Sequence, residues 1–158
     1  MSASERVVRP AQAQDVVALV DLRRVMFEAM GVAGTDRAPW QKAAGGWFRA
    51  ALDDADVLAV VADLDGEVVA SALGQLRRGC PGPSTPTGVD VLLSSVATAP
   101  GRRRQGHARA CVEAVLAWAR ERGADRVELF ATAEAVGLYE ELGFRRADHP
   151  ALRAALVL

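Results

Sequence analysis

Val96-Ala-Thr-Ala-Pro-Gly-Arg-Arg-Arg-Gln-Gly-His-Ala108 is the segment that decides the fold. It follows an apolar run, Asp90–Thr98, that predicts a strand, and it leads into Gly106–Arg122, where apolar residues repeat along one helical face. The N-terminus of a helix has unpaired backbone N–H groups and partial positive charge, so it suits an anion. Three consecutive arginines, Arg102–Arg104, add charge beside it. The segment therefore predicts a phosphate-binding turn between a strand and a helix.

The turn differs from two well-known phosphate loops. No Gly-Lys-Ser/Thr follows it, so it is not a P-loop, and no Gly-x-Gly-x-x-Gly supports a dinucleotide-binding fold. An arginine-rich surface loop before an ordinary helix is the alternative that these residues alone leave open.

The rest of the chain predicts a mixed α/β fold with about four helices. Asp65-Gly66 indicates a hairpin, and the Gly- and Pro-rich segment Arg78–Gly88 indicates a loop between two strands. The sheet is expected to be mostly antiparallel, with a parallel pair around the Gly106–Arg122 helix. The remaining expected strands are Val7–Arg9, Val57–Ala62, Glu67–Leu76, Arg126–Ala131 and two closing strands, Phe144–Ala147 and Ala154–Leu158, and the remaining helices are Asp15–Met30, Trp40–Leu52 and Ala133–Leu142.

Composition indicates one intracellular domain. The chain has 158 residues, and its 19 basic and 20 acidic residues leave a net charge of −1, which favours neither nucleic acid nor an anionic membrane. The two cysteines, Cys80 and Cys111, form neither a disulfide framework nor a metal-ligand spacing. No run reaches the about 18 apolar residues of a membrane span, and Met1–Pro10 does not resemble a signal peptide. We expect a single cytoplasmic domain, 1–158, a monomer or homodimer, with no metal, nucleic-acid or membrane partner.

The phosphate turn resembles a motif of the GNAT superfamily of N-acetyltransferases. Arg103-Arg-Gln-Gly-His-Ala108 matches the Arg/Gln-x-x-Gly-x-Gly/Ala pattern of that family, at the same place between strand and helix. The resemblance implies that backbone amides of this turn hold the pyrophosphate of coenzyme A and that the end of the preceding strand pairs with the pantetheine arm. The implied cofactor-binding residues are Val96, Ala97, Thr98, Arg103, Arg104, Gln105, Gly106, His107, Ala108 and Arg109.

A second motif, Leu138-Tyr-Glu-Glu-Leu-Gly-Phe144, resembles the family's Leu-Tyr-x-x-x-Gly-Phe. The resemblance implies that Tyr139, the single tyrosine, is the general acid that protonates the departing thiolate; the alternative is a packed helix residue. Where the family often has an asparagine that contacts coenzyme A, this chain has Thr132, expected either to cap the short helix or to reach the cofactor. The two motifs in this order are more specific than either alone.

The resemblance predicts an acetyl-CoA-dependent N-acetyltransferase in which a neutral amine attacks the thioester directly. The general base stays open between Asp90, Glu128, His149 and a water chain. The acceptor also stays open between a small amine, an amino acid derivative and a protein or peptide N-terminus, and no acidic cluster favours a polycation. Residues that either line an apolar mouth or belong to the core are Met26, Met30, Trp40, Trp47 and Phe48.

Two rival functions remain at this level. A non-catalytic, regulatory CoA-binding module would keep the phosphate turn and use Tyr139 only for packing. An interaction domain using Arg102–Arg104 is disfavoured by the net charge and by the lack of interleaved aromatic residues.

Overall fold

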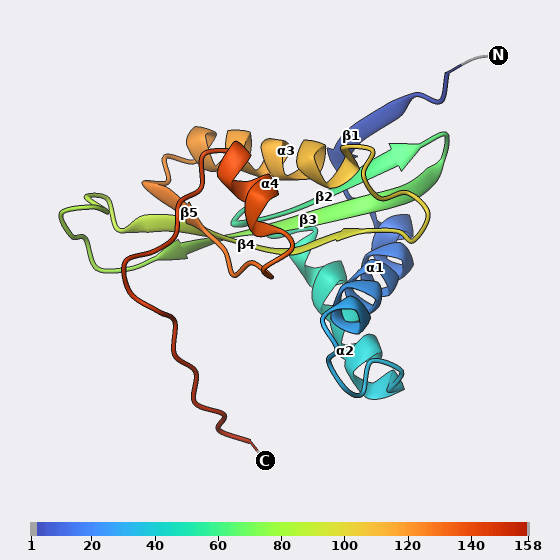
Figure 1. The fold of residues 1–158 in the computed structure, drawn as a ribbon, viewed down its shortest axis with the longest axis horizontal. Coiled ribbons are helices and arrows are strands. Elements are labelled where there is room, and N and C mark those ends of the chain that lie inside the picture. The colour runs from blue at the N-terminus through green and yellow to red at the C-terminus, as the bar shows by residue number, and fades with distance from the viewer. Residues whose placement is uncertain (1–2, 158) are drawn as a thin grey trace.

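The computed structural model describes residues 3–157 and has a layered α/β architecture (Figure 1). A five-stranded sheet separates α3 on one face from α1 and α2 on the other. In chain order the elements are β1 (Arg6–Pro10), the 3-10 helix η1 (Ala13–Asp15), α1 (Val16–Ala29), α2 (Ala38–Ala51), β2 (Val57–Leu64), β3 (Glu67–Arg78), β4 (Val89–Thr98), α3 (His107–Glu121), β5 (Arg126–Glu128) and α4 (Val136–Glu141).

The strands follow one another across the sheet in the order β1-β2-β3-β4-β5. The first three pairings are antiparallel, and β4 and β5 form a parallel pair because α3 connects them across one face. The mixed fold, the hairpin at Asp65-Gly66 and the loop before Val89 are confirmed. The parallel pair forms one edge of the sheet.

Alternation along the buried strands builds two cores. In β2, Val60 and Ala62 belong to the cluster that α3 covers with Val112 and Val115, whereas Ala59 and Val61 belong to the cluster under α1 and α2. Gly74 on β3 lets α3 approach closely, because a Cβ there would lie 2.8 Å from Val115 Cγ1. Cys111 is in the first core, where burial raises the pKa of its thiol to about 12.

The end of the chain differs from the expectation. Residues 144–147 and 154–157 form no strand, and Leu158 lies outside the described residues. The ring of Phe144 instead packs edge-to-face on Tyr139, with centroids 5.7 Å apart. The expected strand Arg126–Ala131 is also shorter than predicted, since β5 ends at Glu128.

Within residues 3–157, every helix is too short or too polar to span a lipid bilayer.

Candidate active site

A bulge at Ser95 interrupts β4. Between Ser94 and Ala97, three residue steps along β4 face only two along β3. Ser95 has a φ of +50°, a left-handed conformation that is uncommon for a residue other than glycine. The Ser71 hydroxyl donates to the Ser95 carbonyl oxygen at 3.3 Å, and Arg23 Nη1 donates to Ser95 Oγ at 2.6 Å. Two side chains from neighbouring elements therefore hold the bend in β4.

Beyond the bulge, β4 has a free edge. β5 pairs with β4 only from Asp90 to Leu92, so among the described residues no strand pairs with Leu93–Thr98 on the β5 side. Figure 1 shows β4 extending well past the end of β5. Unpaired backbone N–H and C=O groups at such an edge can bind an extended ligand as an added strand. Val96, Ala97 and Thr98 lie along this edge.

The turn from β4 into α3 forms an open cradle of backbone amides. Arg104 and Gly106 have left-handed φ angles of +61° and +79°. A Cβ on Gly106 would meet only Arg6 Nη1, at 3.6 Å, so the space beside this backbone is open. Left-handed residues at the start of a helix turn backbone N–H groups into one concavity, the geometry that binds phosphate. Arg103 and Gln105 lie in the same turn, and Ala108 is the second residue of α3.

Positive charge surrounds this cradle. Arg103 and Arg104 are exposed and have no acidic partner within residues 3–157, whereas Arg102 pairs with Glu67 at 3.2 Å. Arg6, on β1, reaches the turn and donates to the Gln105 carbonyl oxygen at 3.5 Å. Sequence reasoning missed Arg6, since 99 positions separate it from Gln105 and only the sheet brings them together.

Arg109, in the first turn of α3, has two acidic partners. It pairs with Glu141 at 2.7 Å and with Glu113 at 3.5 Å, so it links α3 to α4. Its guanidinium is therefore already neutralised by two carboxylates.

His107 begins α3 and is buried, with 6% of its surface exposed. Its Nε2 lies 3.1 Å from Gln105 Oε1, and since that amide oxygen can only accept, Nε2 carries the proton. Nδ1 is then a bare acceptor, and among the described side chains it is the one polar atom that is sealed from solvent without a partner. Burial, followed by the charges of Arg6 and Arg102, lowers the pKa of His107, so the imidazole is neutral at neutral pH. The neutral ring packs against the turn and helps to fix its shape.

The ring of Tyr139 is buried in the core beneath α3, on α4. Its hydroxyl makes no hydrogen bond with any residue in the described range. Unlike His107 Nδ1, the hydroxyl oxygen is not fully buried, so it is accessible to solvent or to a ligand. Burial raises the pKa of the phenol, so it stays protonated at neutral pH. A protonated hydroxyl without a protein partner is free to serve a ligand.

Thr132 does not cap α4, which corrects one expectation. The N-cap of α4 is Ala135, and no side-chain oxygen caps this helix. The backbone carbonyl of Thr132 instead accepts from Ala135 N at 3.0 Å, in a turn that precedes the helix. The helix starts later than Ala133 because residues 133–135 form that turn.

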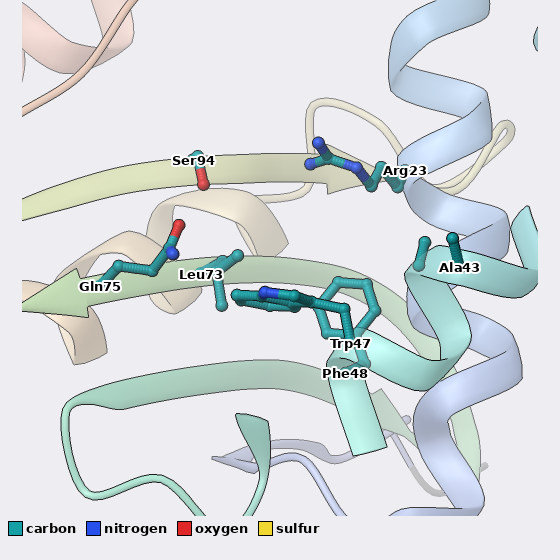
Figure 2. Close-up of a pocket in the computed structure, with 8 residues that line it drawn as sticks. Arg23, Ala43, Trp47, Phe48, Leu73, Gln75 and Ser94 are labelled. Carbon is teal, nitrogen blue, oxygen red and sulfur yellow. The ribbon is translucent and has the colours of Figure 1, made fainter. Parts of the chain in front are cut away.

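A pocket of about 440 Å³ opens beside the bulge, between α1, α2 and the sheet (Figure 2). Trp47 and Phe48 form one wall, and the guanidinium end of Arg23 extends from α1 over β4 toward Ser94. The lining residues are Arg23, Ala43, Ala44, Trp47, Phe48, Leu73, Gln75 and Ser94. Of the five residues expected at an apolar mouth, Trp47 and Phe48 line this pocket, and Trp40 lines a neighbouring one that also includes Arg23.

Arg23 was missed by sequence reasoning, although a signal was present. It lies four positions after Leu19 and four before Phe27. Residues four apart share one face of a helix, so Arg23 lies along the apolar face of α1 and not on its polar face. A charged residue at such a position is unusual in a core-facing helix.

The candidate bases lie away from this pocket, and no carboxylate is among its lining residues. Asp90 pairs with Arg77 at 2.7 Å and with Arg126 at 3.3 Å, and the Arg77 hydrogen bond holds the pKa of that carboxyl below its usual range. Glu128 lies 3.3 Å from the same Arg77. His149 is exposed in the coil after α4.

Comparison with known proteins agrees with this geometry. Residues 18–144 match the model of the acetyltransferase (GNAT) family. The fold is similar to that of a predicted acetyltransferase from Clostridium acetobutylicum solved with acetyl-CoA, at 21% identity and a TM-score of 0.84, covering 96% of this chain and 97% of that one. A GCN5-related N-acetyltransferase from Ralstonia eutropha JMP134 has 22% identity and a TM-score of 0.84, with 95% and 99% covered.

An aminoglycoside N-acetyltransferase solved with CoA also shares the fold, at 17% identity and a TM-score of 0.77, with 99% of this chain and 98% of that one covered. No sequence among curated proteins matches the chain. At these identities the solved structures support the fold alone.

Proposed function

The chain belongs to the GNAT family of acetyltransferases, and we propose that it moves an acetyl group from acetyl-CoA to the nitrogen of a primary amine. One observation carries the proposal: the free edge of β4, Leu93–Thr98, runs from the acceptor-sized pocket at Ser94 to the amide cradle at Gly106. An extended pantetheine arm paired with this edge would have its pyrophosphate in the cradle and its thioester beside the bulge.

The residues fit coenzyme A in charge and shape. The open space at Gly106 admits a phosphate oxygen to the backbone, and Arg103, Arg104 and Arg6 supply positive charge around it. Val96, Ala97 and Thr98 offer backbone groups to the arm, and Gln105, His107 and Ala108 shape the turn. Thr132 precedes α4 close in sequence to Tyr139 and is a further candidate contact, as is Arg109, whose side chain also pairs with Glu113 and Glu141.

In the proposed reaction the amine nitrogen attacks the thioester carbonyl carbon, the C–N bond forms and the C–S bond breaks. Tyr139 gives its proton to the departing thiolate, and the proton that the attacking nitrogen releases restores the phenol through water; the unpartnered hydroxyl and raised pKa of Tyr139 suit this role. The ammonium of the acceptor loses its proton to water, because the acidic side chains near β4 are held in ion pairs and none lines the pocket.

Calorimetry with acetyl-CoA tests the cofactor site. The wild type is expected to bind in the micromolar range, and Gly106→Trp is expected to abolish binding because the indole would fill the cradle. Gly123→Trp is the matched control: Gly123, past the opposite end of α3, also has a left-handed φ and open space. Amine-dependent release of the CoA thiol then tests transfer. Folded wild type that fails to bind at millimolar acetyl-CoA would contradict the proposal.

A regulatory module that binds coenzyme A without catalysis is the second candidate. The absence of a carboxylate from the pocket lining favours it. Binding of acetyl-CoA without thiol release across a broad amine panel would select this candidate over the enzyme.

A further inference from the structure

Arg23 is a half-buried cation without a counter-charge. No carboxylate of residues 3–157 lies within salt-bridge distance of it. It interacts with two neutral groups. Its Nη1 donates to Ser95 Oγ at 2.6 Å, and its Cζ lies over the Phe27 ring, 4.7 Å from the ring centroid. Burial lowers the pKa of the guanidinium, but an arginine keeps its charge at neutral pH. A charge withdrawn from water is costly unless an opposite charge pairs with it.

The position of Arg23 directs this charge into the acceptor pocket. Its side chain lines both the pocket beside the bulge and the neighbouring cavity under Trp40. Figure 2 shows the guanidinium extending toward Ser94, across from Trp47 and Phe48. One N–H of Arg23 donates to Ser95, and the other donors have no partner in the described part of the chain. The pocket thus combines an apolar wall with a guanidinium whose remaining N–H groups are available to a ligand.

We propose that Arg23 binds a carboxylate of the acceptor, so that the substrate is an amine carrying a carboxylate on an apolar body, such as an apolar α-amino acid. This inference rests on the proposed acetyl transfer. A guanidinium fork matches a carboxylate in shape and charge, and its single positive charge balances a monoanion. Since no second cation lines the pocket, a phosphate dianion would stay half-neutralised. A polycationic acceptor would be repelled.

The apolar body and the amine have matching surfaces. Trp47, Phe48 and Leu73 can contact a side chain of leucine or phenylalanine size in a space of about 440 Å³. Ser94 and Gln75 are the polar groups left for the amine. Ser94 adjoins the bulge and the free edge of β4, so an amine held there faces the expected position of the thioester.

Binding to the CoA-loaded protein tests this inference without turnover. L-phenylalanine and L-leucine are each titrated by calorimetry against their own amides, which keep the amine and the side chain and lack the negative charge. In the wild type the acids are expected to bind at least about tenfold more tightly than the amides, as for a charge-assisted pair. Arg23→Met should reduce this ratio to near one, and Arg23→Lys should keep part of it.

Ser95→Ala is the matched control for a purely structural role of Arg23. It removes the hydrogen bond to the bulge and keeps the cation, so the preference for acids should survive. Near-ultraviolet circular dichroism and acetyl-CoA binding check that each variant is folded. A wild-type ratio near one, failure of all four ligands to bind at roughly 10 mM, or a preference that persists in Arg23→Met overturns the inference.

The two proposals fail separately. If acids bind better through Arg23 but no thiol is released with any amine, the acetyl transfer is wrong and the carboxylate site stands. If amines are acetylated with no advantage of acid over amide, the carboxylate site is wrong and the transferase stands.

Discussion

Arg9 Nη1 on β1 lies 2.7 Å from Oδ2 of Asp15, the N-cap residue of α1. Asp15 is 4% exposed, and the same oxygen accepts from Gln12 N at 2.7 Å, while Arg9 also pairs with Asp63 at 3.1 Å. One carboxylate therefore fixes both the edge strand and the entry into α1. The hydrogen bond from Arg9 is the main reason that the pKa of Asp15 is lowered.

Asp15→Asn is expected to destabilise the fold by about 2–4 kcal/mol at pH 7, because a mostly buried ion pair loses one partner. Since the folded pKa of Asp15 is depressed, its contribution is present above the unfolded value of about 3.9 and is lost as pH falls through the folded pKa. Urea unfolding against pH measures this. Asp21→Asn is the control, because Asp21 makes an exposed pair with Arg24. Equal effects of the two variants would contradict the assignment.

Gly74→Ala is expected to lower the free energy of unfolding by about 1–3 kcal/mol, because the new Cβ would lie 2.8 Å from Val115 Cγ1 and 3.0 Å from Trp118 Cζ3. Gly46→Ala, in α2, meets nothing within 4 Å and should raise it by about 0.5–1 kcal/mol through helix propensity. Thermal and urea unfolding compare the pair. If Gly74→Ala is neutral, α3 does not pack as closely on β3 as described.

His107→Leu is expected to make the fold less sensitive to mild acid. Because the folded pKa of His107 is lowered, its neutral form favours folding above the unfolded pKa of about 6.5, and that stability is lost as pH falls toward and below the folded pKa. Unfolding at pH 8 and pH 5.5 should differ less in the variant than in the wild type. His149→Gln, at the other histidine, which is exposed, should keep the wild-type difference. An unchanged difference in His107→Leu argues against a buried neutral imidazole.

Tyr139→Phe is expected to reduce kcat by about 10²–10⁴-fold, the usual contribution of a general acid, with acetyl-CoA binding retained. The packing on Phe144 should survive, since the ring is kept. The raised pKa of Tyr139 predicts that activity does not fall with pH until above pH 10, the ordinary value for tyrosine. Steady-state kinetics from pH 6 to pH 10 with calorimetry separates the two roles. Full activity in the variant would leave Tyr139 with packing alone.

The sequence predicted those parts of the molecule whose cause is local. Apolar periodicity predicted the helix Gly106–Arg122 and the strand Asp90–Thr98, which the structure has as His107–Glu121 and Val89–Thr98. The closing strands were wrong because a strand needs a neighbour to pair with, and an apolar stretch such as Ala154–Leu158 says nothing about whether one is present. Phe144 contacts Tyr139 instead of extending the sheet.

The missing parts of the candidate site depend on contacts between distant segments. The two neighbouring serines of β4, Ser94 and Ser95, do not predict a bulge. The bulge depends on the register with β3 and on the hydrogen bond from Arg23 to Ser95. Arg6 likewise reaches the phosphate turn only through the fold. It lies on the edge strand β1, which contacts α3, and the turn precedes that helix. The positions of Ser95 and Arg6 in the site are set by strand register and tertiary contacts, which leave no local sequence pattern.

The bulge at Ser95 has a consequence for association between molecules. An unpaired strand edge of the length of Leu93–Thr98 is a template on which a strand of another chain can add, and long regular edges of this kind cause aggregation. A left-handed residue in the middle bends the edge, so an incoming strand cannot keep its hydrogen bonds in step on both sides of Ser95. The distortion that opens β4 to a small extended ligand therefore also discourages edge-to-edge pairing with a second sheet.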